Sequence, residues 1–153
     1  FKDYAVGAST KMERDSFSRH HLLINSRWTY DNKFSANDYI WVNNGIEKSK
    51  KMIDKIFAIA EKFDSQISIA VYPWPAQVLY DSGKSKQSKI WKKFCEKKCE
   101  FFIDVFETFD EIKERKGSEY VVLNYYFPNN IHYNKEGNVL IFKKLNSYFD
   151  KIY

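Results

Sequence analysis

Apolar residues recur at steps of three and four along positions 46 to 63, while lysines and acidic residues fill the positions between them. The recurring positions are Ile46, Ile53, Ile56, Phe57, Ala60 and Phe63, and the small polar residue Ser49 falls in the same series. This period is typical of an amphipathic helix. We expect the helix to follow Gly45 and to end at Asp64-Ser65.

The run from Ile67 to Tyr72 is short and rich in branched residues, which predicts a buried strand. Pro73 and Pro75 should end it, because proline has no N–H to donate to a neighbouring strand. We therefore expect Tyr72, Trp74 and Gln77 to lie in a loop at the carboxyl end of this strand.

The rest of the chain alternates between stretches with the helical period and short apolar runs typical of strands. The expected elements are a turn at 81–85, a helix at 86–98 with Ile90, Trp91, Phe94 and Cys95 inward, a strand at 100–106, a helix at 108–116 ending at Gly117, an extended stretch at 120–127 and a closing helix at 135–153.

Alternating helices and strands predict an α/β domain with a parallel sheet. In such sheets, sites collect beyond the carboxyl ends of the strands, where the 72–77 and 129–134 stretches should meet. We expect one domain over residues 1–153, with 1–45 irregular and 46–153 regular. Only two strands are evident, so we expect further strands upstream of the chain or within residues 1–45.

Composition narrows the function classes. With 153 residues, 44% of them hydrophobic and 18% aromatic, the chain should form a packed core. The net charge of +5 is spread over separate lysine-rich segments without a nucleic-acid-binding motif, so nucleic acid is not an expected partner. No apolar run approaches ~20 residues, so we expect no membrane-spanning segment. The chain opens at Phe1 without a Met, and we expect it to be part of a longer polypeptide.

Metal and cofactor signals are weak. The Cys95–Cys99 spacing lacks a second pair of ligands, so the two residues are either buried thiols or a local disulfide. His20-His21 likewise has no Cys or carboxylate at ligand spacing. We expect neither a metal nor a cofactor.

His132 is the strongest candidate for chemistry. It lies in a polar loop just before Asn134, which is placed to cap the closing helix. A neutral imidazole there could act as a general base, with its second nitrogen held by an acceptor two or three residues earlier. An exposed loop histidine without a catalytic role is the simpler alternative.

The block Asn130-Ile-His132-Tyr-Asn134-Lys-Glu-Gly137-Asn138 resembles the last conserved block of SGNH (GDSL-like) hydrolases. The 67–77 strand with its YPWPAQ end, the 91–95 helix and the 102–106 strand resemble the middle of a bacterial SGNH-like group linked to surface-polysaccharide genes. The resemblance covers roughly residues 40–150. It implies a flavodoxin-like three-layer parallel sheet of SGNH-hydrolase type, incomplete at the N-terminus, and a location facing the cell envelope or periplasm.

The resemblance implies an esterase or O-acyltransferase that uses Ser, His and Asp. His132 matches the family's histidine, whereas Asn130 and Asn129 stand where its acid is expected. Ser9 in Val6-Gly7-Ala8-Ser9 is a weak match for the nucleophile, and no Gly-x-Asn-Asp block is present. The nucleophile should therefore come from a missing N-terminal portion of the same polypeptide, and this chain alone should be inactive.

The expected substrate is a small-molecule or carbohydrate ester, bound by Tyr72, Trp74 and Gln77, because aromatic rings stack on sugars and an amide can bond hydroxyls. Packing at the end of the strand is the alternative role for these three residues. The rival function is a non-catalytic carbohydrate-binding or scaffolding domain that keeps the fold without a complete triad. The sequence fits a receiver or nucleotide-binding domain less well, because it contains neither an acidic phosphoacceptor cluster nor a Gly-rich phosphate loop.

Overall fold

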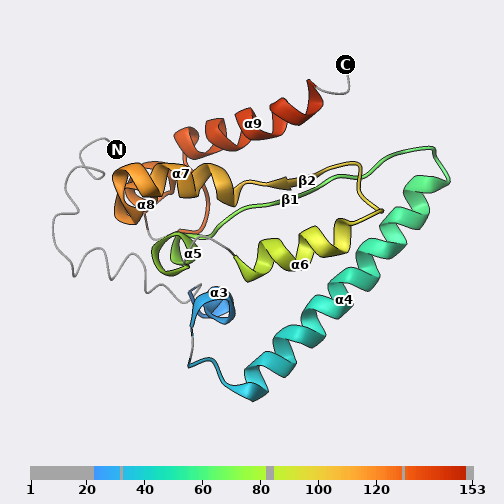
Figure 1. Ribbon diagram of the computed structural model, residues 1–153, viewed down its shortest axis with the longest axis horizontal. Helices are drawn as coiled ribbons and strands as arrows, with labels where there is room; N and C mark the ends of the chain where they lie inside the picture. Colours follow the sequence, from blue (N-terminus) through green and yellow to red (C-terminus); the bar gives the residue numbers. More distant parts are fainter. Residues whose placement is uncertain (1–22, 32, 82–84, 129, 151–153) are drawn as a thin grey trace.

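A computed structural model describes residues 23–31, 33–81, 85–128 and 130–150. Within these ranges the protein is a mainly helical α/β structure with seven helices around a small parallel sheet (Figure 1). The helices are α3 (Leu23–Tyr30), α4 (Ala36–Glu61), α5 (Pro75–Tyr80), α6 (Lys86–Cys95), α7 (Phe106–Lys116), α8 (Ser118–Tyr125) and α9 (Lys135–Phe149). The prediction of an α/β fold with a parallel sheet is confirmed at this level.

The sheet consists of β1 (Ile69–Val71) and β2 (Phe102–Asp104), both within the predicted stretches. The strands are parallel, with Ile69 opposite Phe102 and Val71 opposite Asp104. Their carboxyl ends therefore lie at the same edge. β1 stops before Pro73, as the sequence predicted.

The core lies beyond this edge, where α5, α7 and α8 pack together and α9 covers α8 and β2 (Figure 1). Val105 and Val121 are fully buried at its centre, and Phe109 stacks on Tyr133 with ring centroids 5.3 Å apart. Aromatic side chains thus account for much of the buried apolar surface around the candidate site.

The long helix α4 begins at Ala36, ten residues before the expected position. The Ser35 hydroxyl accepts a hydrogen bond from the Asp38 N–H at 3.1 Å, which caps the helix. Gly45, expected to precede the helix, lies inside it and is exposed. Together with α3, this shows that residues 23–45 are largely helical rather than irregular. Residues 1–22 lie outside the described residues.

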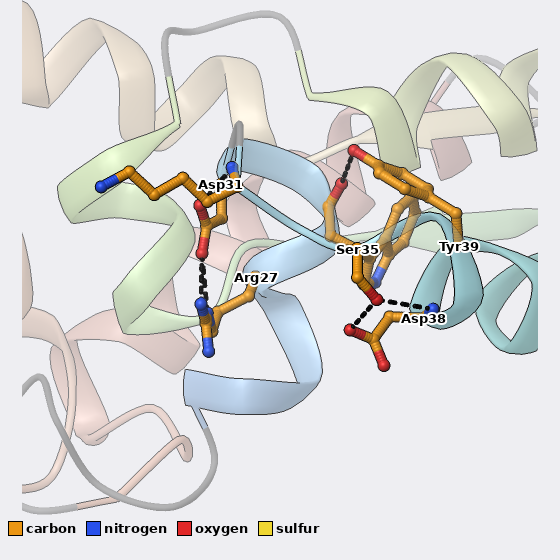
Figure 2. Close-up of polar contacts among 7 residues, drawn as sticks. Arg27, Asp31, Ser35, Asp38 and Tyr39 are labelled. Carbon is orange, nitrogen blue, oxygen red and sulfur yellow. Dashed lines mark hydrogen bonds and ion pairs between the residues drawn. The ribbon is translucent and has the colours of Figure 1, made fainter.

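A polar corner joins α3 to α4 (Figure 2). Arg27 at the end of α3 pairs with Asp31, whose other carboxylate oxygen accepts the Lys33 N–H at 2.8 Å. The Tyr39 hydroxyl on α4 donates to the Trp28 carbonyl at 3.5 Å. These contacts set the direction in which α4 leaves the corner.

Two other stretches differ from expectation. The 75–80 stretch, expected to be a loop, forms the short helix α5, since Pro75 starts it and Gln77 caps it by accepting the Trp74 N–H at 2.9 Å. The 120–127 stretch, expected to be extended, forms most of α8. Gly117, with φ of 89°, ends α7 and allows the chain to turn directly into α8.

The remaining elements agree closely with the prediction. α6 starts at Lys86 and α9 starts at Lys135. α6 ends at Cys95, three residues early, where Cys95 forms a disulfide with Cys99. The disulfide alternative is therefore the one observed. The predicted turn falls partly at residues 82–84, which lie outside the described residues.

None of the described helices combines the length and the apolar character needed to cross a bilayer.

Candidate functional site

The loop that carries His132 is a small closed unit between α8 and α9. Tyr126 and Tyr133 form an antiparallel bridge at its base. One residue closer to the tip of the loop on each side, the Phe127 N–H donates to the His132 carbonyl at 3.0 Å. The backbone pairing positions His132 at the end of a turn that is anchored on both sides.

Asn130 fixes the imidazole. Its Oδ1 accepts the backbone N–H of His132 at 3.1 Å, which identifies the atom facing His132 as the amide oxygen rather than the amide nitrogen. The same Oδ1 lies 2.5 Å from His132 Nδ1, so Nδ1 must carry the proton of a neutral ring. The lone pair is then on Nε2. The His132 side chain is exposed, and within the described ranges Nε2 has no hydrogen-bond partner.

The tyrosines at the base of the loop attach it to the end of β1. The Tyr126 hydroxyl donates to the Pro73 carbonyl at 2.8 Å, and the Tyr133 hydroxyl donates to the same carbonyl at 2.5 Å. Both rings are almost completely buried. Burial raises the pKa of both phenols well above the ordinary value, so the tyrosines stay neutral donors. The predicted meeting of the two stretches at the strand ends is therefore observed.

Asn134 connects the loop to both neighbouring helices. Its Oδ1 accepts the Gly137 N–H at 3.0 Å, which confirms the predicted cap of α9, and its Nδ2 donates to the Asn124 carbonyl at 2.8 Å. Gly137 is buried where α9 passes the end of α8. A Cβ at this position would lie 2.2 Å from the Tyr125 carbonyl oxygen. Steric crowding therefore explains why this position of the His132 block is a glycine.

The three predicted substrate-binding residues have different surroundings. Tyr72 is 47% exposed, and its ring packs edge-on against Tyr133 with centroids 5.7 Å apart, next in the chain to His132. Trp74 is half-buried at the start of α5. Gln77 is 3% exposed and bonds both the Trp74 N–H and Gln87, so we assign it a capping role rather than substrate contact.

A serine and a carboxylate that the sequence did not single out meet at the end of β2. The hydroxyl of Ser88 on α6 donates to Asp104 Oδ2, and Asp104 Oδ1 accepts the Phe106 N–H at 3.0 Å. Asp104 also acts on Asp110. Burial raises the pKa of Asp110, the negative charges of Asp81 and Asp104 raise it further, and the positive charge of Lys113 lowers it. A carboxylate at the last position of a strand in a parallel sheet was the available signal. The Ser88–Asp104 bond joins α6 to the sheet.

Several predicted features fall outside the described residues, namely Asn129, Ser9 and the His20-His21 pair. Among the residues that are described, no group of three or more His, Cys, Asp or Glu side chains could hold a metal ion. The site thus contains one oriented imidazole, its amide partner and an exposed aromatic ring nearby.

The chain was compared with protein-family models, with curated proteins and with solved structures, and none of them matches it.

Proposed function

We propose that this chain is part of an SGNH-type esterase or O-acyltransferase acting on ester-linked acyl groups, with carbohydrate esters as the substrate class. The fold in this proposal is a flavodoxin-like three-layer sheet, of which β1 and β2 are two strands. One observation carries the proposal. Asn130 holds Nδ1 of His132 and leaves Nε2 open to solvent at the carboxyl edge of a parallel sheet.

The proposed mechanism gives each residue a role. Nε2 of His132 removes the proton from a hydroxyl nucleophile, which a segment outside this chain supplies, and later returns a proton to the leaving alcohol. Asn130 orients the imidazole through its carbonyl oxygen. Tyr72 offers a ring face or edge for a sugar.

The amide at position 130 limits the rate. It accepts the Nδ1 proton but carries no charge, so it does not stabilise the imidazolium that forms during the reaction. In a serine triad the corresponding Asp→Asn change lowers turnover by about 10⁴-fold, a loss that includes the wrong imidazole tautomer, which the Asn130 carbonyl avoids here, so the loss of charge alone should cost less. We therefore expect slow turnover in the full-length polypeptide.

The test is hydrolysis of p-nitrophenyl acetate and of an acetylated oligosaccharide by the full-length polypeptide. His132→Ala should abolish turnover above background. Asn130→Asp should raise kcat by at least about 10-fold, since it restores a carboxylate behind the imidazole. The matched control is Asn43→Asp, at an exposed position on α4, which should change nothing. Equal turnover in the wild type and His132→Ala would refute the proposal.

The rival proposal is a carbohydrate-binding or scaffolding domain without catalysis. The uncharged Asn130 and the exposed Tyr72 favour it. In that case, Tyr72→Ala should weaken binding of the acetylated oligosaccharide in calorimetry, whereas His132→Ala and Asn130→Asp should leave binding unchanged and no variant should hydrolyse it.

A further inference from the structure

The turn after α6 holds the middle of α4 in place. Lys98 in this turn pairs with Asp54 at 2.6 Å, and its Nζ lies 4.5 Å from the centre of the Phe94 ring. The Phe94 and Phe57 ring centroids are 6.4 Å apart. Within the described part of the chain, Val42 is the only buried residue of α4. The ion pair is exposed and contributes little by itself, so α4 depends on the turn keeping these contacts together.

The same turn also holds the segment through which α4 leads into β1. The Glu100 N–H donates to the Ile67 carbonyl at 2.9 Å, and the Phe101 N–H donates to the Ser68 hydroxyl at 3.2 Å. Residues 98–101 therefore contact both the helix and its exit, so a change in the shape of the turn would act on both.

A disulfide between Cys95 and Cys99 closes the turn. Two hydrogen bonds support the same closure, because the Lys98 and Cys99 N–H groups both donate to the Cys95 carbonyl, at 2.9 and 3.1 Å. Lys97, between the cysteines, has φ of 65°. A residue with a side chain rarely adopts this left-handed conformation, which persists only where the surrounding structure enforces it. The covalent bond therefore helps to hold Lys97 in a conformation that the reduced turn would tend to leave.

The two cysteines differ in their exposure. Cys95 is 5% exposed, whereas Cys99 is partly exposed. Reduction of a disulfide begins when a thiolate attacks one of its sulfur atoms, so access decides which sulfur reacts. Lys97 is exposed close to Cys99 in the chain, and its positive charge would attract an incoming thiolate. Cys99 is therefore the residue at which reduction would start.

We propose that the Cys95–Cys99 disulfide is a redox-sensitive switch, and that its reduction by a dithiol releases the middle of α4 from α6. A thiolate of the reductant attacks Sγ of Cys99, and Cys95 leaves as a thiolate that takes up a proton. The second thiol of the reductant then displaces Cys99 from the mixed disulfide. The protein gains two electrons and two protons, and the reductant departs as its own disulfide.

Release follows from the geometry of the turn. Without the disulfide, Lys97 can leave its positive φ, and the neighbouring Lys98 then moves away from Asp54. The contact between Phe57 and Phe94 loses the ion pair beside it, and separation of the helices exposes both half-buried rings. This proposal is independent of the hydrolase proposal, because it uses no residue of the candidate site.

The experiment is hydrogen exchange, measured by mass spectrometry on the full-length polypeptide before and after treatment with dithiothreitol. Reduction should make the amides of residues 52–60 exchange at least about 5-fold faster, because opening of α4 no longer has to break its contacts with α6. Exchange in α9 should stay the same. The double variant Cys95→Ser/Cys99→Ser should match the reduced protein and should not respond to dithiothreitol.

Position 97 separates this mechanism from a general loss of stability. Lys97→Gly removes the cost of the positive φ, since glycine adopts it readily. The turn should then keep its shape after reduction, and exchange at 52–60 should rise less than about 2-fold. The matched control is Lys97→Ala, which removes the charge but keeps the side-chain restriction on φ, and it should respond like the wild type.

Four results would overturn the proposal. Equal exchange at 52–60 in the oxidised and reduced proteins would show that the disulfide does not hold α4. Faster exchange in α9 as well as in α4 would assign the disulfide to the stability of the whole fold. An equal response of Lys97→Gly and Lys97→Ala would remove the link through the positive φ. A disulfide that stays intact in dithiothreitol, detected by thiol labelling, would exclude a switch.

Discussion

Replacing Gly137 by alanine tests the packing that supports the His132 loop. In most helices this change is favourable by up to about 1 kcal/mol. Here the added Cβ would lie 2.2 Å from the Tyr125 carbonyl oxygen and 2.8 Å from Tyr133 Cδ1. The contact with Tyr125 involves a backbone atom, so a rotamer change cannot relieve it. α9 must move away from α8.

The magnitude follows from what that movement costs. Forcing an extra methyl into a packed core costs about 1–3 kcal/mol. The same movement weakens the hydrogen bond from the Asn134 N–H to the Tyr125 carbonyl, 3.0 Å long, which contributes about 1 kcal/mol. After subtracting the gain in helix propensity, we expect Gly137→Ala to lower the free energy of unfolding by roughly 2 kcal/mol.

Gly45 provides the matched control. It lies inside α4, and a Cβ there would meet nothing within 4 Å. Gly45→Ala should therefore raise the free energy of unfolding by about 1 kcal/mol. Urea unfolding followed by circular dichroism would measure both variants. A Gly137→Ala protein as stable as the wild type, beside a stabilised Gly45→Ala protein, would refute the close approach of α9 to α8.

Three further outcomes are expected. Asn134→Ala should cost about 2 kcal/mol in urea unfolding, because it removes the α9 cap and a hydrogen bond to α8, whereas Asn146→Ala should cost less than about 0.5 kcal/mol. Stability should fall as pH rises above about 10, since Tyr126 and Tyr133 ionise in the unfolded chain there while burial keeps them protonated in the folded one. Absorbance at 295 nm should then show these two phenols ionising only when the protein unfolds. Ionisation of all tyrosines before unfolding would contradict the burial of Tyr126 and Tyr133. Lys144→Met, which breaks an exposed ion pair to α7, should cost less than about 0.5 kcal/mol, and a larger loss would give that pair a greater role than its exposure allows.

Local chemistry made several elements predictable from the sequence. The branched run before Pro73 can form a strand and must stop there. Gly117 readily adopts the positive φ that ends α7, and the side chain of Asn134 is suited to starting a helix. The pairing of His132 with an acceptor two residues earlier was also foreseeable, because Asn130 is within reach in a tight turn. Whether these residues catalyse a reaction remains a prediction.

Other elements depend on contacts that the sequence does not display. The 120–127 stretch has the Val and Tyr residues of a strand, but burial of Val121 and Val122 against the core favours a helix. Gly45 suggested a boundary, yet α4 runs through it. The useful signal was Ser35, three residues before Asp38, which is a capping pattern. The buried role of Gln77 follows from its distant partner Gln87.

The two-point anchoring of the His132 loop has a consequence for how this region can vary. The Tyr126–Tyr133 bridge and the Pro73 carbonyl hold the base, so Pro128, Asn130 and Ile131 form a tip that contributes little to the core. A mutation at the tip can change the group behind the imidazole while the scaffold stays intact. The fold would then tolerate an acid, an amide or a hydroxyl at position 130. Substitutions there would change the reactivity of His132 while the surrounding structure stays the same.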